Sequence, residues 1–257
     1  MPKKGRTLKP LAVQLWSLRE EAANDFPAVL KRVADIGYAG VEPAGMHGHD
    51  PREIGKLIAD LGMEVPAIHV STPNSENLAE IVEEAQALGA KYVVGGYSPL
   101  YGETDEAWRE TAVRFRQAGE MLEPYGLSFA FHNHWFEFAP YGDGFMYDML
   151  LAEAPNVSSE LDVYWAAVGG ADPIELLRRY KSHIPLLHAR DGMLKEERSM
   201  VAVGSGVLPI PEIIRAADSD VLQWLVVEID DGEGDMFEAV EESYRYLTSM
   251  GLAQGTK

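Results

Sequence analysis

The sequence predicts a single α/β domain with the architecture of a closed (β/α)8 barrel. Short runs of β-forming residues alternate with amphipathic helical segments along the whole chain, and eight such pairs can be counted. No Gly/Ser linker or low-complexity tract divides the 257 residues, a length that suits one large domain. We expect residues 1 to 10 to form a flexible N-terminal arm and residues 11 to 257 to form the barrel.

The predicted strands share β-branched, aromatic or apolar residues in runs of about six, bounded by turn residues. They cover residues 11–17, 39–44, 65–71, 92–97, 128–134, 157–163, 185–191 and 225–230. Helices fill the intervals between them. The segments 27–37, 51–62, 77–89 and 106–126 carry apolar residues at helical spacing, and each ends in a glycine that favours a left-handed cap.

Composition and charge exclude several classes of function. Lys and Arg total 22 against 41 for Asp and Glu, and the resulting net charge of -19 repels nucleic acid and anionic membrane surfaces. With no cysteine, any metal must be held by histidines and carboxylates. The basic start MPKKGRTLKP leads into an apolar run too short for a signal peptide or a membrane span. We therefore expect a cytoplasmic protein that binds neither nucleic acid nor membrane.

The stretch FAFHNHWFEF, residues 129–138, places two histidines at alternate positions of a predicted strand. Side chains two residues apart share one face of a strand, so His132 and His134 are expected to point the same way. In a barrel, functional residues gather late in the strands and face inward. The residues of this kind are Gln14, Trp16, Glu42, His69, His132, His134, Glu160, Asp162, His188, Arg190, Glu228 and Asp230.

Four of these residues on adjacent strands, His132, Asp162, His188 and Glu228, together offer nitrogen and oxygen ligands for a divalent ion. A bound ion would offset the cost of burying them. The alternative is a polar layer of the barrel in which imidazoles and carboxylates satisfy one another without an ion. The spacing alone does not decide between the two.

Several other residues each allow a functional and a structural interpretation. Trp16, Trp135 and Trp165 either form an aromatic wall for a sugar ring or belong to the core. Glu137 is either a catalytic base or an exposed charge at the rim. The glycines of VGSGVLPIPEII, residues 203–214, either bind an anion through backbone N–H groups or serve only the loop after the seventh strand. Four further inward polar residues are expected to contact the substrate: Gln14, Glu42, His69 and Arg190.

The order and spacing of seven stretches give the chain a resemblance to a known family. AVQLWSLRE, FPAVLKRVADIGYAGVE, FHNHWFEF, ELDVYWAAVGGADP, HARDG, VGSGVLPIPEII and VVEID resemble the xylose isomerase-like TIM barrels, in their sugar phosphate isomerase/epimerase branch. The resemblance implies one divalent ion at the barrel mouth on residues from strands five to eight. By position these ligands are His132, Asp162, His188 and Glu228. Mn, Co or Zn suit this ligand set, with Mg as an alternative.

The chain departs from the family pattern at two positions. Most epimerases of the family have Glu where this chain has His132, so only Glu228 remains of their pair of acid–base glutamates, and the second base must be His134, Glu137 or Glu160. Trp165 stands where many relatives carry a substrate-binding histidine. The resemblance is closest to a subgroup with YHNH-type motifs, which includes members similar to inosose dehydratase and to keto-sugar lyases or hydratases.

The resemblance implies an enzyme that removes a proton next to a metal-bound carbonyl of a sugar, keto-sugar or cyclitol. Reprotonation gives isomerisation or epimerisation, whereas loss of a β-substituent gives dehydration or lyase activity. A related endonuclease-like barrel conflicts with the acidic charge, and a non-catalytic sugar-binding barrel is the remaining alternative. Whether the substrate is phosphorylated, and whether the protein forms a homo-oligomer, stay open at this stage.

Overall fold

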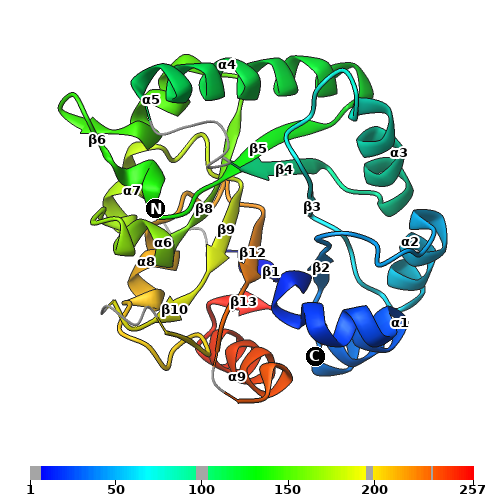
Figure 1. Ribbon diagram of the computed structural model, residues 1–257. Coiled ribbons are helices and arrows are strands. Elements are labelled where there is room, and N and C mark those ends of the chain that lie inside the picture. Colours follow the sequence, from blue (N-terminus) through cyan, green and yellow to red (C-terminus); the bar gives the residue numbers. More distant parts are fainter. Residues whose placement is uncertain (1–6, 97–103, 195–198, 233) are drawn as a thin grey trace, which may run out of the picture.

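The computed structural model describes residues 7–96, 104–194, 199–232 and 234–257. Eight parallel strands form a nearly closed barrel, and helices surround it on the outside (Figure 1). The barrel strands are β1 (Lys9–Gln14), β2 (Gly40–Glu42), β3 (Ala67–His69), β4 (Tyr92–Gly96), β5 (Ser128–His132), β8 (Ser158–Asp162), β9 (Leu186–Ala189) and β12 (Trp224–Val227). The fold predicted from the sequence is confirmed.

The strands are paired in the order in which a (β/α)8 chain lays them down. The sheet runs from β1 through β12, β9, β8, β5 and β4 to β3, and β2 pairs with the other edge of β1. Between β2 and β3 the ladder is reduced to a few backbone hydrogen bonds, which include Val41 N to Glu64 O (3.0 Å) and His69 N to Pro43 O (2.9 Å). The pairing between β2 and β3 is therefore the least regular in the barrel.

Alternation of side chains along the strands separates two apolar regions. On β5, Phe129 and Phe131 point outward and pack on Phe115 of the helix α4 (Asp105–Leu122), with ring centroids 5.3 and 5.6 Å away. Ala130, between them, belongs to a small interior cluster with Ala67, Val94 and Leu186. The small interior residues fill the lower part of the barrel, and His132, two positions further on the same face, reaches the mouth.

Helices follow the strands and cover the outside of the barrel. Their bounds are α1 (Arg19–Ile36), α2 (Pro51–Asp60), α3 (Leu78–Leu88), α4 (Asp105–Leu122), α5 (Met146–Glu153), α6 (Val163–Val168), α7 (Pro173–Arg179), α8 (Ile210–Ala216) and α9 (Met236–Ser249). The predicted glycine stops are present. Gly37 and Gly89 end α1 and α3 with φ of +117° and +72°, a region that residues with a Cβ avoid.

Smaller elements decorate this frame and were not predicted. They are the hairpins β6–β7 (Pro140–Tyr141, Gly144–Phe145) and β10–β11 (Asp191–Gly192, Met200–Val201), the strand β13 (Ala253–Gln254), and the 3-10 turns η1 (Leu15–Leu18), η3 (Glu123–Tyr125) and η4 (Phe136–Phe138). β13 pairs with the start of β1. None of the helices in the described ranges has the length and apolar character needed to cross a membrane.

The structure corrects several predicted boundaries. β5 ends at His132, so His134 lies in the following loop and not on the same strand face. Trp16, Arg190, Glu228 and Asp230 likewise lie just beyond their strands.

At the N-terminus, β1 already begins at Lys9, which shortens the predicted arm by two residues. Residues 1–6 of that arm lie outside the described residues. So does Tyr97, the last residue of the predicted strand 92–97. The single-domain boundaries themselves stay a prediction.

Candidate metal centre and active site

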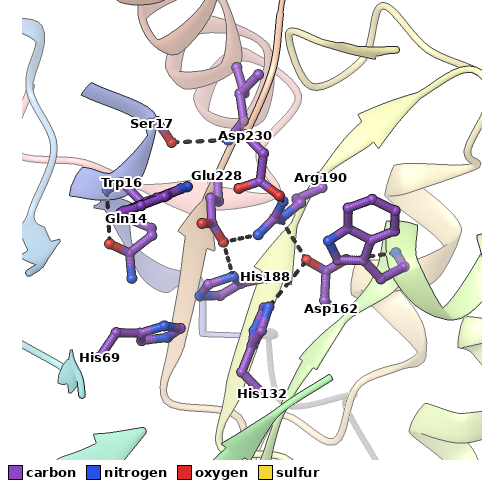
Figure 2. Close-up of polar contacts among 12 residues, drawn as sticks. Gln14, Trp16, Ser17, His69, His132, Asp162, His188, Arg190, Glu228 and Asp230 are labelled. Carbon is purple, nitrogen blue, oxygen red and sulfur yellow. Dashed lines mark hydrogen bonds and ion pairs between the residues drawn. The ribbon is translucent and has the colours of Figure 1, made fainter. Parts of the chain in front are cut away.

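The carboxyl ends of the barrel strands bring the predicted polar residues together at one mouth (Figure 2). Four of them offer one ligand atom each within 4.8 Å of one another, and all four are buried. We call this set the metal group; its members are His132 at the end of β5, Asp162 at the end of β8, His188 on β9 and Glu228 directly after β12. The set is the one that the sequence analysis named.

Several buried atoms of the metal group make close ionic contacts but no hydrogen bond of regular geometry. Nδ1 of His132, Oδ2 of Asp162 and Nδ1 of His188 are buried without a hydrogen-bond partner. Oδ2 of Asp162 lies 4.0 Å from Nε2 of His132, and Nδ1 of His188 lies 2.8 Å from Oε2 of Glu228. Because buried polar atoms are almost always hydrogen-bonded, nitrogen and oxygen atoms that lack a regular hydrogen bond fit the ligand set of a divalent ion.

The local backbone explains how Asp162 is aimed. Asp162 is the N-cap of α6, and its Oδ1 accepts a hydrogen bond of 2.8 Å from the backbone N–H of Trp165. Asn133, which faces away from His132, fixes the backbone of Asp162 from the neighbouring strand by donating to its carbonyl (3.2 Å) and accepting from its N–H (3.0 Å). One carboxylate oxygen is thereby held by the helix, and the other faces the metal group and Nε of Arg190, 2.6 Å away.

A second polar set lies beside the metal group, and we call it the support group: Gln14, Glu42, His69 and Glu160. Gln14 donates to Oε1 of Glu42 (2.7 Å). Nε2 of His69 lies 2.9 Å from Glu42 Oε1 and 2.6 Å from Glu160 Oε2. His69, His132, Glu160 and His188 also meet the spacing of a metal site, but direct contacts between imidazole and carboxylate already join His69 to Glu160. The polar-layer interpretation thus describes the support group well.

Electrostatics distinguish His132 from His69 and His188, since despite burial the carboxylates of Glu160 and Glu42 raise the pKa of His188 well above its usual value. Burial would lower the pKa of His69, but the carboxylates of Glu42 and Glu160 outweigh it and raise that pKa to about 10. In contrast, burial lowers the pKa of His132 well below its usual value, and the neighbouring His188 lowers it further. His132 is therefore a neutral imidazole, the form that binds metals, whereas His69 is held as a cation between two carboxylates.

Arg190 reaches across the metal group from the end of β9. Its Nε lies 2.6 Å from Oδ2 of Asp162, and its two Nη atoms pair with Glu228 and Asp230. Burial raises the pKa of Asp162 to about 7 even though Arg190 acts in the opposite direction. Despite burial, Arg190 and His188 hold the pKa of Glu228 well below its usual range. The guanidinium is buried and fully engaged by these three carboxylates.

The four predicted catalytic residues differ in whether their side chains line the pocket at the barrel mouth. A pocket of about 270 Å³ opens above the metal group and is lined by Trp16, Ala44, His69, His132, His134, Arg190, Glu228 and Asp230. His134 and Glu228 thus line it, whereas Glu160 is fully buried in contact with His69. Burial, with Arg190 acting in the same direction, lowers the pKa of His134 to about 4.

Glu137 is not the exposed rim charge that one interpretation of the sequence allowed. It is fully buried in η4, and its Oε2 accepts a hydrogen bond of 2.8 Å from the backbone N–H of His134. Burial raises the pKa of Glu137 to about 8, while the hydrogen bond from His134 lowers it. Because Glu137 does not line the pocket, its geometry supports a role in positioning the loop that carries His134.

The three tryptophans follow different strands and are not equivalent: Trp16 follows β1, Trp135 follows β5 and Trp165 lies in α6 after β8. Trp16 and Trp135 are 47% and 37% exposed, whereas Trp165 is 8% exposed. Trp135 packs on Trp165 with ring centroids 4.9 Å apart. Trp16 lines the pocket at the mouth, as the predicted aromatic wall requires, whereas Trp135 and its buried neighbour Trp165 do not line it.

The loop VGSGVLPIPEII has a different role from the anion site that the sequence allowed. The carboxylate of Asp191 accepts hydrogen bonds of 2.9 to 3.1 Å from the backbone N–H groups of Gly192, Gly204, Gly206 and Leu208. The second interpretation, in which the glycines serve the loop, is therefore the one that the geometry supports. Sequence reasoning missed Asp191 as well as Asn133, and only the glycine spacing gave a signal for the former.

Comparison with known proteins places this geometry in a family. Residues 30–250 match the family described as xylose isomerase-like TIM barrel. Curated relatives include inosose dehydratase of Geobacillus kaustophilus (strain HTA426), 22% identical over 244 residues that cover 79% of this chain and 79% of the relative. Inosose dehydratase of Lacticaseibacillus casei is 21% identical over 281 residues, which cover 89% of this chain and 91% of the relative.

Solved structures agree with this assignment. A sugar phosphate isomerase/epimerase from Parabacteroides distasonis ATCC 8503 superimposes with a TM-score of 0.79 at 26% identity, covering 98% of both chains. The IOLI protein, solved with a bound zinc atom, has a TM-score of 0.73 at 16% identity and covers 95% of this chain and 98% of its own. At this identity the likeness shows the fold alone. With the matched residues spanning most of the barrel, the chain belongs to the xylose isomerase-like TIM barrel family.

Proposed function

We propose that this protein is a metal-dependent enzyme that removes a proton from the carbon next to a carbonyl of a sugar, keto-sugar or cyclitol. The observation that carries the proposal is the metal group, whose four buried ligand atoms lie within 4.8 Å of one another beneath a pocket that Trp16 lines. The names of the relatives, an isomerase/epimerase and dehydratases, agree with chemistry of this kind.

One divalent ion, of Mn, Co or Zn with Mg as an alternative, would be held by His132, Asp162, His188 and Glu228. When bound, such an ion supplies polarisation of a substrate carbonyl, which acidifies the neighbouring C–H bond. The chain's own residues then have to bind and orient the substrate and move the proton.

We assign the proton transfer to His134 and Glu228, because these two of the four catalytic candidates line the pocket. They reach it from different strands, so a substrate ring in the pocket has an acid–base group on two sides. Glu137 holds the backbone of His134 in place. His69 at the pocket wall and Trp16 at its rim are placed to orient hydroxyl groups and the apolar face of a ring.

Isomerisation or epimerisation follows if a second group returns the proton to carbon. Dehydration is the second candidate, and one observation favours it: the strand-five ligand is His132, so a single glutamate, Glu228, is available at the metal group as an acid–base residue. The inosose dehydratases among the relatives agree with this alternative.

The test is proton exchange in deuterated water followed by NMR, with metal-loaded protein and a panel of ketohexoses and keto-cyclitols. Deuterium at the carbon beside the carbonyl with an altered configuration, or with a moved carbonyl, would support isomerase or epimerase activity. Loss of a hydroxyl with formation of an unsaturated product would support dehydration. Absence of exchange with every compound, in protein that binds one ion per chain, would contradict the proposal.

A further inference from the structure

The pocket above the metal group does not end at Trp16. A second hollow of about 520 Å³ shares Trp16, Ala44 and His69 with it and extends toward α3, where Ser71, Asn77, Glu80 and Glu84 line it. A substrate that binds at the metal group therefore has room to extend toward α3.

The α3 side of this hollow carries uncompensated negative charge. Glu80 and Glu84 are one helical turn apart, and neither has an ion-pair partner within the described part of the chain. Burial, together with the charge of Glu80, raises the pKa of Glu84. Two like charges at this spacing repel each other and any anion that approaches them.

The guanidinium groups near the mouth are already engaged. Arg190 pairs with Asp162, Glu228 and Asp230. Arg19, outside both pocket linings, donates to the carbonyl of Asp230 (2.7 Å), lies 3.3 Å from Asp231 and stacks on Trp16 at 5.1 Å. Among the described residues that line the two hollows, no lysine or further arginine is present.

One half of the backbone site that many (β/α)8 barrels use for phosphate is also filled. That site is formed by the loops after the seventh and eighth strands. Here β9 is the seventh barrel strand, and the N–H groups of the loop after it donate to the carboxylate of Asp191. A phosphate group would have to displace a buried carboxylate that four N–H groups bind.

The negative charge on α3, the engaged guanidinium groups and the occupied N–H groups of the loop after β9 all bear on the charge of the substrate. The inference from them rests on the proposed function. We infer that the site takes an uncharged ring, a keto-sugar or keto-cyclitol without a phosphate group, and that Glu80 and Glu84 determine this specificity by repelling phosphate esters. The apolar face of the ring lies against Trp16, and its hydroxyl groups face His69 and Asn77.

The test compares matched compounds on metal-loaded protein: keto-cyclitols, and ketohexoses each paired with its 6-phosphate ester. Binding is measured by titration calorimetry and proton exchange by NMR. We expect each ester to bind roughly tenfold more weakly than its uncharged partner, with the difference shrinking as salt is added. Glu80→Gln and Glu84→Gln should each narrow this ratio several-fold.

Glu83→Gln is the matched control, because Glu83 lies on the same helix, pairs with Arg52 and does not line either hollow. It should leave the ratio unchanged. The inference would be overturned if the esters bind as tightly as the uncharged compounds, or if Glu80→Gln and Glu84→Gln leave the affinity ratio unaltered. Proton exchange in any ketose would still support the proposed function in either case. If no compound binds or exchanges, both are overturned.

Discussion

Two buried aspartates at the carboxyl ends of neighbouring strands, Asp162 and Asp191, show how differently one residue type is used in this barrel. Both oxygens of Asp191 accept backbone hydrogen bonds from its own loop. Asp162 has one oxygen bound by Trp165, whereas the other faces the metal group and Nε of Arg190 (2.6 Å), and burial raises its pKa to about 7. A carboxylate that its own backbone binds through both oxygens organises the chain, whereas one that faces other ionisable side chains is available to a ligand.

The largest effect that would test this contrast is the replacement of Asp162 by asparagine. Asn retains the capping oxygen for Trp165 but loses the charge, so Asp162→Asn should fold while metal binding and activity fall by more than the roughly 100-fold that loss of an outer partner costs. Elemental mass spectrometry and the exchange assay check this. Asp172→Asn, which keeps the exposed cap of α7, is the control and should retain its ion.

The opposite result is expected at Asp191. Asp191→Ala leaves four backbone N–H groups without their acceptor, and each unsatisfied group costs about 1 to 3 kcal/mol, so we expect a loss of about 3 kcal/mol or more in the free energy of unfolding. Urea unfolding measures it. The folded fraction should still bind one ion per chain. A variant as stable as the wild type would remove the structural half of the comparison.

Ligand binding should itself stabilise the fold. A divalent ion at 100 times its dissociation constant adds about 2.7 kcal/mol, which for a chain of this size corresponds to roughly 5 to 10 °C in Tm. Thermal unfolding with and without a chelator should show this shift in the wild type and in Asp172→Asn. The Asp162→Asn protein should show little or none of it, and an equal shift there would place the ion elsewhere.

Glu137 is the intermediate case, with Oε2 bound by His134 and Oε1 unpaired. Its pKa is raised from 4.5 to about 8, so the folded state binds a proton that the unfolded state has lost, and this group makes stability fall as pH rises between those values. In chelator-treated protein, Glu137→Gln should remove a decrease of roughly 3 kcal/mol in the free energy of unfolding between pH 5 and pH 8. Identical pH profiles for the two proteins would show that Glu137 does not titrate in this range.

Much of the fold could be predicted because its signals are local. Glycine stops and alternating β and helical periods lie within single elements, and the left-handed caps at Gly37 and Gly89 are present as expected. The metal group was predicted from strand parity, since His132, Asp162 and His188 all lie within regular strand.

The remainder depends on contacts between distant segments. The alternating pattern of the sequence continues past His132 to His134. The strand β5 nevertheless ends at His132, which is also the last residue of β5 that pairs with β8. Glu137 is buried because η4 turns it under the loop. Three of the four partners of Asp191 lie 13 to 17 residues away along the chain, and the glycine spacing does not show which carboxylate they bind.

The position of β1 has a consequence for how the protein is made. β1 lies between β2 and β12, and its first residues also pair with β13 at Ala253–Gln254. While the ribosome is still synthesising the middle of the chain, one edge of β1 has no native partner and offers open N–H and C=O groups to other polypeptides. Completion of the barrel must therefore follow synthesis of the last strands, and until then the nascent chain depends on protection from aggregation.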